Sequence, residues 1–271
     1  PRRWEPGGIT EEAAAPNDLW TVDLKGWWRT RDRKRCEPLS VRDAFSRYVT
    51  HLKPVEQRTT EKVKERFEEV FERYGLPKRI LCDNGSPFAS LTGLHGLTRL
   101  SAWWRMLGIK MERIRVGHPE QNGAHERMHA DIAREIEKRP STTWEEECER
   151  LERWRIEYNL KRPHEALGMK TPAEVYRSSA RRYEGVVKEW PYPWQYEQRK
   201  VRRQGTIKLG RREVFISEAL KGWLLGLEGM GSSTLRVWFC DLCLGELDLN
   251  SAAPLRPEAE AELPSSVSYT H

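Results

Sequence analysis

The sequence predicts an α/β protein in which a mixed sheet flanked by helices is followed by a small all-β domain. Three observations support this prediction. Over residues 17–180, short apolar runs of strand length alternate with longer stretches of helical periodicity. Their order is β-β-β-α-β-α-β-α-α, which a sheet with helices on its faces accommodates. After Tyr183 the pattern changes to short apolar runs separated by Gly and Ser, which is typical of a small barrel.

These patterns divide the chain into five segments. We expect a leader at 1–16, an α/β core at 17–180, a linker rich in Pro and basic residues at 181–200, a small β-barrel at 201–250 and a disordered tail at 251–271. The tail is predicted from its Pro, Glu, Ala and Ser content, which offers little apolar surface to bury.

The core begins with three predicted strands and a helix. The strands are expected at 19–24, 39–44 and 47–54, and their short connections indicate an antiparallel meander. The helix that follows is capped by Thr59 or Thr60, and Gly75 ends it. Its apolar residues recur at helical spacing and predict one buried stripe, formed by Val63, Phe67, Val70, Phe71 and Tyr74.

The remaining core elements are predicted from the same two periodicities and from the positions of Gly and Pro. They are expected, in order, as a strand at 79–82, a helix at 97–107, a strand at 109–116, a loop at 117–123, a helix ended by Pro140, a helix over 144–158 and a short helix that starts at Thr171-Pro172.

Three acidic residues lie on separate segments of this core. Asp23 and Asp83 each end a short apolar run, as carboxylates at strand ends would, and Glu126 lies near the start of a predicted helix. Hard divalent cations prefer oxygen ligands, and a pair of Mg²⁺ ions needs a few carboxylates that converge on one point. Such a pair clamps the attacking and leaving oxygens of a phosphoryl transfer. The three residues are therefore candidate metal ligands.

The charge distribution favours a polyanionic partner. The chain carries 47 Lys and Arg against 41 Asp and Glu, a net charge of +6. From Arg199 to Arg212 there is no acid, and the bases are Arg199, Lys200, Arg202, Arg203, Lys208, Arg211 and Arg212. Taken alone, such a run is as typical of an exposed, solvated loop as of a phosphate-binding segment. Beside a carboxylate metal site, contact with nucleic-acid phosphates becomes the favoured interpretation.

Membrane and secreted classes are not predicted. No apolar run approaches the roughly 18 residues of a membrane span, and the first residues lack the apolar stretch of a signal peptide. The five cysteines are odd in number and spread along the chain, which favours a reducing, cytoplasmic setting over a disulfide framework. Cys240 and Cys243 lack two further ligands at zinc spacing, so a structural role is favoured.

Four stretches of the sequence resemble, in order, the integrase-type transposases of bacterial insertion sequences. The matching stretches are 17–26, 82–88, 117–127 and 162–172. These DDE transposases have a retroviral-integrase-like catalytic core of the ribonuclease-H-like superfamily. The resemblance implies a three-carboxylate site, which Asp23, Asp83 and Glu126 fill by position. Between the last two lie 42 residues, somewhat more than is usual in the family, and the excess fits a loop at 89–96.

The resemblance also implies an activity, a cofactor and partners. The activity is DNA strand cleavage and strand transfer by in-line phosphoryl transfer with two Mg²⁺ ions, for which Mn²⁺ substitutes. Asp23 would bridge the two ions, with Asp83 on one and Glu126 on the other. The partners would be element ends and target DNA, handled by a homodimer or a higher oligomer at the bacterial nucleoid. No membrane partner is expected.

Further residues are candidates for DNA contact. Lys25 shares the strand face of Asp23 and would meet either a phosphate or a carboxylate. Asn122 would shape the turn before the catalytic helix or touch DNA, and His129, one turn beyond Glu126, would face the site. Arg134 would either contact the DNA backbone or lie on a solvated face of its helix. The basic run adds Arg199, Lys200, Arg202 and Arg203.

Two alternatives remain open. Residues 125–129 also read His-Glu-x-x-His, the zinc metalloprotease motif in which Glu126 would be the general base. An extended motif of that class has Gly and His where this chain has Ile132 and Glu135, and Asp23 and Asp83 would then have no role. A nuclease of the same fold, which hydrolyses DNA without joining it, is the second alternative.

Overall fold

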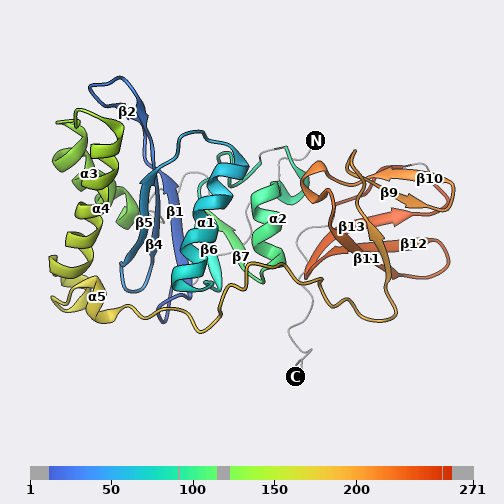
Figure 1. Cartoon of the computed structure of the whole chain (residues 1–271). Coiled ribbons are helices and arrows are strands. Elements are labelled where there is room, and N and C mark those ends of the chain that lie inside the picture. The colour runs from blue at the N-terminus through green and yellow to red at the C-terminus, as the bar shows by residue number, and fades with distance from the viewer. Residues whose placement is uncertain (1–11, 91, 115–122, 252, 258–271) are drawn as a thin grey trace. The chain divides into compact units, whose positions relative to one another are not determined.

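The computed structural model describes residues 12–90, 92–114, 123–251 and 253–257 (Figure 1). The chain forms two compact units. The core unit comprises the described residues up to Phe88 and those from Leu107 to Val186. The C-terminal unit comprises Ala89–Met106 and the described residues from Val187 onward. Most of the predicted leader, and the predicted tail from residue 258, lie outside the described residues.

A mixed five-stranded sheet forms the centre of the core unit, as predicted. Its strand order is β5-β4-β1-β6-β7. The first three pair antiparallel, and β6 and β7 run parallel to β1. The bounds are β1 Leu19–Leu24, β4 Pro38–Asp43, β5 Val49–Pro54, β6 Arg79–Cys82 and β7 Lys110–Arg113. A two-residue ladder of β2 (Trp28–Arg29) and β3 (Arg35–Cys36), absent from the prediction, lies between β1 and β4 in the chain.

Helices pack on both faces of this sheet because β1 presents alternate side chains to each side. Trp20 is fully buried, and its ring centroid lies 6.0 Å from that of Phe71 on α1 (Thr60–Tyr74). Thr21, on the opposite face, hydrogen-bonds to His125 of α3 (Gly123–Ile132). The predicted cap residues of α1 are confirmed, since the Thr59 side chain accepts from the amide of Lys62 and Gly75 follows the last turn.

The second half of the core unit is helical. α3 continues into η3 (Ala133–Glu137), a π-helical turn that the sequence pattern did not predict. α4 (Trp144–Lys161) starts at a capping box formed by Thr143 and Glu146. The short elements η4 (Glu165–Leu167) and α5 (Pro172–Val175) follow. Met128, Ile132 and Ile136 pack against α4 and β5 in one apolar cluster.

The C-terminal unit is rich in β-strands, and its strands form two separate sheets. One has four strands in the order β13-β12-β11-β8, and the other pairs β10 with β9. The bounds are β8 Glu197–Lys200, β9 Thr206–Leu209, β10 Arg212–Phe215, η5 Glu218–Leu220, β11 Leu224–Gly229, β12 Thr234–Phe239 and β13 Leu242–Asp248. Closure into a barrel therefore stays a prediction.

Two of the predicted segment boundaries differ from the structure. Strand β8 falls in the stretch expected to be a linker, where it pairs with β11 through its backbone. Arg256 falls in the expected tail, where its amide and carbonyl both hydrogen-bond to Glu246 of β13. Both segments lack an apolar alternation, so the sequence pattern did not reveal their pairing.

Residues 89–106 pack with the C-terminal unit. This stretch holds η1 (Leu94–Gly96) and α2 (Arg99–Met106). Leu97 and Ala102 belong to one buried cluster with Val201, Leu225 and other β-strand residues of that unit. Leu94, in the loop expected at 89–96 as an insertion, packs against the same cluster, so this loop contributes to a hydrophobic core. Among the described residues, no helix is both long and apolar enough to cross a bilayer.

The buried His51 makes the stability of the core unit depend on pH. Burial, with the charges of Lys53, Arg66 and Arg155, lowers the pKa of His51 to about 3. Below pH 6.5 the unfolded chain protonates this imidazole while the folded chain does not, so stability falls as the pH falls. Between pH 7 and pH 5 we expect His51 to account for a loss of about 2 kcal/mol in the free energy of unfolding.

Urea unfolding at both pH values, for the wild type and for His51→Asn, measures this contribution. The variant should show a smaller decrease between pH 7 and pH 5, by the same amount. An unchanged pH dependence in the variant would contradict the assignment, whatever its absolute stability.

Candidate active site

Asp23 lies near the carboxyl end of β1, in the middle of the sheet. It shares a face of the strand with Leu19 and Thr21, and its partner across β4 is Ser40. Its side chain is about one-fifth exposed, at 21%. The hydroxyl of Ser40 donates to the backbone carbonyl of Asp23 over 3.1 Å, which fixes the strand at this point.

Asp83 directly follows β6, the parallel neighbour of β1. The register pairs Val22 with Cys82, so Asp23 and Asp83 follow paired residues at the carboxyl ends of two adjacent parallel strands. Burial raises the pKa of the Cys82 thiol to about 12, and the charges of Asp83 and Asp23 both contribute. The charges of both carboxylates therefore act on the same thiol, that of Cys82. Such strand ends are where open α/β sheets bind ligands.

The turn after β6 is held by its own polar groups. A carboxylate oxygen of Asp83 accepts from the amide of Gly85 over 3.1 Å, and the side-chain amide of Asn84 donates to the carbonyl of Ile114 over 2.8 Å. These bonds tie the segment after β6 to the end of β7, and they restrict the position of Asp83.

Glu126 is exposed in the first turn of α3. The residue before it, His125, is fully buried against the sheet. Asn122, the other predicted residue at this turn, lies outside the described residues. The structure thus places Glu126 on the helix that covers the sheet face of Asp23.

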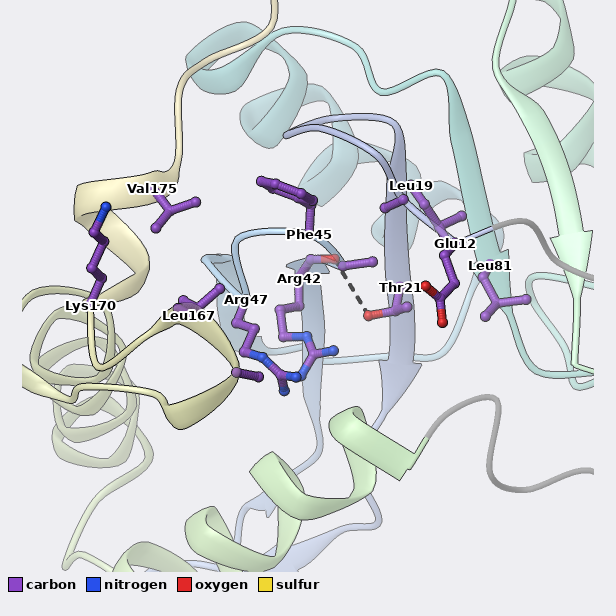
Figure 2. A pocket seen from close by; sticks show the side chains of 13 residues that line it. Glu12, Leu19, Thr21, Arg42, Phe45, Arg47, Leu81, Leu167, Lys170 and Val175 are labelled. Atoms are coloured by element: carbon purple, nitrogen blue, oxygen red, sulfur yellow. Dashed lines mark hydrogen bonds between the residues drawn. The ribbon is translucent and has the colours of Figure 1, made fainter.

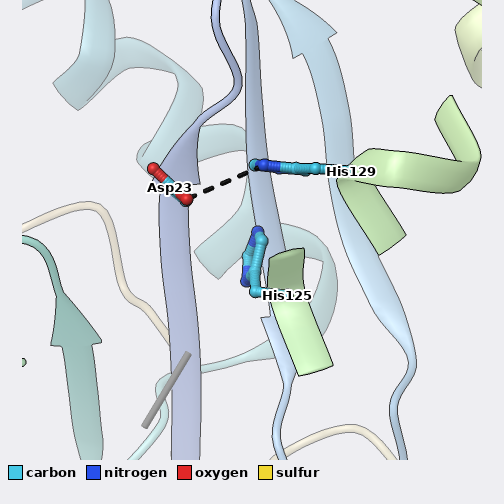
Figure 3. Close-up of side chains that lie close together, drawn as sticks. All are labelled: Asp23, His125 and His129. Carbon is cyan, nitrogen blue, oxygen red and sulfur yellow. Dashed lines mark ion pairs between the residues drawn. The ribbon is translucent and has the colours of Figure 1, made fainter. Parts of the chain in front are cut away.

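Two histidines and a serine form a hydrogen-bonded network beside Asp23, and Figure 3 shows the two histidines next to this carboxylate. Ser40 Oγ lies 2.6 Å from His125 Nε2 and 2.8 Å from His129 Nε2. His125 Nδ1 lies 2.9 Å from Thr21 Oγ1. His129 Nδ1 faces Asp23 Oδ2 at 3.7 Å. The network connects β1, β4 and α3 directly at the candidate site.

Both histidines are neutral. Burial lowers the pKa of His129 to about 3, with Lys25 and Arg42 adding to the effect. Burial likewise brings the pKa of His125 well below its usual value. A neutral His129 does not compensate the charge of Asp23. Because Ser40 donates its hydroxyl proton to the Asp23 carbonyl, His129 Nε2 donates to Ser40 Oγ, and Nδ1 is left without a proton as an acceptor or a metal ligand.

Asp23, His125 and His129 are grouped closely enough to hold a metal ion, with ligand atoms within 4.8 Å of one another. Of these, His125 is poorly suited, since both its ring nitrogens already have hydrogen-bond partners. A metalloprotease site needs both histidines of the His-Glu-x-x-His motif as ligands. The geometry therefore does not favour the zinc alternative.

Two of the residues predicted to contact DNA, Lys25 and Arg134, contact protein groups in the described structure. Lys25 is buried, forms an ion pair with Glu137 and lies 5.0 Å from the ring centroid of Trp28. Of the two partners expected for Lys25, a phosphate or a carboxylate, the described structure thus shows the carboxylate. Arg134 is exposed and pairs with Asp131 at 2.8 Å, as on a solvated helix face.

The predicted basic residues of the C-terminal unit line one hollow of about 580 Å³. Arg199 and Arg202 in it also pair with Glu197 and Glu213. Lys221 was missed from the sequence because no other base lies near it in the chain. The residues that line the hollow are Arg199, Lys200, Val201, Arg202, Arg203, Lys208, Lys221 and Gly222.

Comparison with known proteins points to one family. Integrase core domain models match residues 13–119 and 107–172. The chain is 26% identical over 161 residues to a 31.7 kDa protein of insertion element IS407 from Burkholderia multivorans, covering 59% of this chain and 55% of that protein. It is 25% identical over 163 residues to a 39.2 kDa protein of insertion element IS476 from Xanthomonas euvesicatoria, covering 60% and 45%. The chain thus spans about half the length of these relatives.

Two solved structures are also similar. One is the HTLV-2 integrase catalytic core domain in complex with magnesium, at 17% identity and a TM-score of 0.46, covering 60% of this chain and 99% of that one. The other is the simian T-cell lymphotropic virus intasome in complex with the PP2A regulatory subunit B56 gamma, at 14% identity and a TM-score of 0.49, covering 90% and 83%.

Proposed function

Because the chain belongs to the integrase-type proteins of bacterial insertion sequences, with a ribonuclease-H-like core, we propose that it cleaves DNA strands and transfers them to a target. The observation that carries the proposal is the placement of Asp23 and Asp83 at adjacent carboxyl ends of parallel β1 and β6. Carboxylates so placed hold the divalent cations that in-line phosphoryl transfer requires.

The donor set fits magnesium. Asp23 and Asp83 lie at the carboxyl ends of adjacent strands, and Glu126 is exposed on the helix over the same sheet face. The three carboxylates offer the oxygen ligands that Mg²⁺ prefers. The same carboxylate and water ligands also suit Mn²⁺. We therefore expect Mn²⁺ to substitute.

The residues of the site have two tasks in this proposal. Asp23, Asp83 and Glu126 would together hold the divalent cations. When bound, the ions would activate the attacking oxygen and stabilise the leaving one. Ser40 is a positioning residue, because its hydroxyl donates to the backbone carbonyl of Asp23 and also binds His129 of α3.

DNA is the proposed partner, in the form of element ends and target DNA. A reaction that processes two ends together needs at least two active sites, so we infer a homodimer or a higher oligomer. This substrate places the proposed activity at the bacterial nucleoid.

One assay tests the proposal. The full chain is incubated with labelled DNA that carries a free 3′-hydroxyl and with supercoiled target, in the presence of Mg²⁺ or Mn²⁺. Metal-dependent joined products are the expected result. Metal-dependent nicking without joining would instead support the nuclease of the same fold. Wild-type chain that neither nicks nor joins in either metal would contradict both.

The hollow of the C-terminal unit is proposed to contact the DNA backbone. Removing one cation that meets a phosphate lowers the salt dependence of binding by about one unit of log K per log salt. We expect Arg203→Gln with Lys221→Gln to lower that slope by about two. Fluorescence anisotropy over a range of salt concentrations, in metal-free buffer, measures it.

A double variant of equal charge change serves as the control. Lys62 and Arg153 are exposed on α1 and α4, where they pair with Glu65 and Glu149. Lys62→Gln with Arg153→Gln should leave the slope nearly unchanged. Equal effects of the two double variants would mean that only net charge matters and that the hollow makes no specific contact.

A further inference from the structure

A pocket of about 730 Å³ opens in the core unit on the sheet face that carries Asp23 (Figure 2). Leu19 and Thr21 line it from the same face of β1 as Asp23, and Leu81 lines it from the same face of β6 as Asp83. Thr21 precedes Asp23 by two residues, about 7 Å along the strand. The pocket therefore adjoins the candidate site on the sheet.

Two arginines line this pocket. Arg42 projects from β4, and Arg47 comes from the turn between β4 and β5. Figure 2 draws both guanidinium groups at the same end of the pocket, and the charge of Arg47 acts on Arg42. Arg47 has a left-handed backbone conformation, with φ of 63°, which is unfavourable for a residue other than glycine. Such strain is often found where a side chain must be presented to a ligand.

The charge of Arg42 lacks a carboxylate partner. The side chain is only 3% exposed, and Nη1 donates to the carbonyl of Ala124 over 2.8 Å. Within the described part of the chain, Nε has no hydrogen-bond partner. The side chain of Tyr158 hydrogen-bonds to Arg42, but burial raises the pKa of this phenol, so it stays neutral and supplies no counter-charge, while burial lowers the pKa of Arg42.

Neither nearby acid forms an ion pair with the arginines in the described structure, although the charge of Asp43 acts on Arg42. Asp43 follows Arg42, but its carboxylate accepts from the amides of Asn17 at 2.6 Å and Ser46 at 2.7 Å. Glu12 lines the pocket beside Thr21 in Figure 2, and it forms no ion pair with Arg42 or Arg47 in the described structure. A buried charge without a counter-ion is strongly unfavourable, so the pocket is suited to an anion.

A second hollow with two arginines extends from the pocket toward Glu126. It has a volume of about 360 Å³, shares Arg47 and Ala166 with the pocket, and is also lined by Arg127, His164 and one acid, Glu165. Arg127 is exposed on α3, next in sequence to Glu126. An anion that occupies the pocket can therefore be one group of a longer chain that passes the candidate active site.

Residues 162–172, one of the stretches that carry the family resemblance, gain a role from this arrangement. Ala166, Leu167 and Lys170 of this stretch form one wall of the pocket. Two backbone hydrogen bonds fold the stretch back on itself. The amide of His164 donates to the carbonyl of Lys170, and the amide of Met169 donates to the carbonyl of His164. The wall is apolar apart from Lys170, as suits the sugar and base that accompany a phosphate.

We propose that Arg42 and Arg47 bind a backbone phosphate of the DNA strand that enters the candidate active site. Guanidinium groups bind phosphate through paired, charge-assisted hydrogen bonds, and such contacts set the position of a strand rather than its sequence. This inference rests on the proposed function, because it assumes a DNA substrate.

A series of oligonucleotides tests the contact, each with one neutral linkage in place of a different backbone phosphate. Each oligonucleotide carries one methylphosphonate, and its affinity for the full chain is measured by anisotropy in metal-free buffer. For the wild type we expect one or two linkages at which the substitution weakens binding roughly tenfold. For Arg47→Gln we expect weaker binding of unmodified DNA and no further loss at those linkages.

Arg153→Gln is the matched control, because it removes one charge from an exposed arginine of α4. This variant should keep the full loss at the sensitive linkages. Arg47 is only partly buried, so Arg47→Gln is expected to fold, which circular dichroism checks. Equal losses for the wild type and Arg47→Gln at every linkage would overturn the proposal.

Inorganic phosphate distinguishes a DNA contact from a site for a free anion. If phosphate raises the melting temperature of the wild type but not of Arg47→Gln, and no linkage couples to Arg47, the pocket binds a free anion and the DNA assignment is wrong. The outcome is also separable from the proposed function. Metal-dependent cleavage, with no linkage whose effect depends on Arg47, would contradict only the phosphate contact. A linkage whose effect depends on Arg47, without any cleavage, would contradict only the catalytic proposal.

Discussion

Replacing Asp23 by Asn is expected to lower metal-dependent DNA cleavage and joining by about a thousandfold or more. The metal ions supply several kcal/mol of transition-state stabilisation, and each 1.4 kcal/mol is about tenfold in rate. Asn has the shape of Asp but no charge, so it binds divalent cations weakly. Asp83→Asn and Glu126→Gln should have effects of similar size, because all three carboxylates are proposed ligands.

The measurement is the joining assay, with urea unfolding to show that each variant is folded. Asp131→Asn is the control, since Asp131 lies on α3 and pairs with the exposed Arg134. It removes one carboxylate from the same helix and should keep activity near that of the wild type. Any of the three variants that retains activity would exclude that residue from the site.

Replacing Trp20 by Ala is expected to lower the free energy of unfolding by about 3–5 kcal/mol. The indole is fully buried, packs against Phe71, and donates from Nε1 to Asn17 Oδ1 over 3.1 Å. Truncation leaves a cavity between the sheet and α1. Because whole domains are stable by only about 5–15 kcal/mol, this loss should also reduce activity by unfolding the strand that carries Asp23.

Two further variants separate the causes of that loss. Trp20→Phe keeps most of the buried ring, and Asn17 Oδ1 still accepts from the hydroxyl of Tyr176 over 3.0 Å, so a smaller loss is expected. Trp194→Ala is the exposed control, because that side chain is 90% exposed and should contribute less than about 0.5 kcal/mol. Urea unfolding followed by far-UV circular dichroism measures all three. A loss for Trp20→Ala no larger than for Trp194→Ala would contradict the prediction.

Local patterns predicted the sheet well. The strand expected at 19–24 is β1, and those expected at 39–44 and 47–54 are β4 and β5 within two residues at each end. Their apolar runs face a helix on at least one side, so burial appears directly in the sequence. The pattern did not reveal β8, because Glu197–Lys200 is polar throughout and is held only by backbone bonds to β11.

The candidate site was predictable where it depends on position along a strand. Asp23 and Asp83 each end an apolar run. The parallel pairing of β1 with β6 then places both residues at the carboxyl ends of adjacent strands. The network around Asp23 was not predictable, because Thr21 and Ser40 become partners of the histidines only through the β1–β4 register. Arg42 and Arg47 were missed because neither belongs to a basic run.

The placement of α2 has a consequence for the order in which the chain folds during synthesis. Leu97 and Ala102 are covered by strands that begin at about residue 201. At translation rates of about 5–20 residues per second, this helix would leave the ribosome at least several seconds before its partners exist. The chain also returns from α2 to the sheet at β7. A nascent chain would thus expose apolar surface after its sheet is complete, and we expect it to need a chaperone until the last strands emerge.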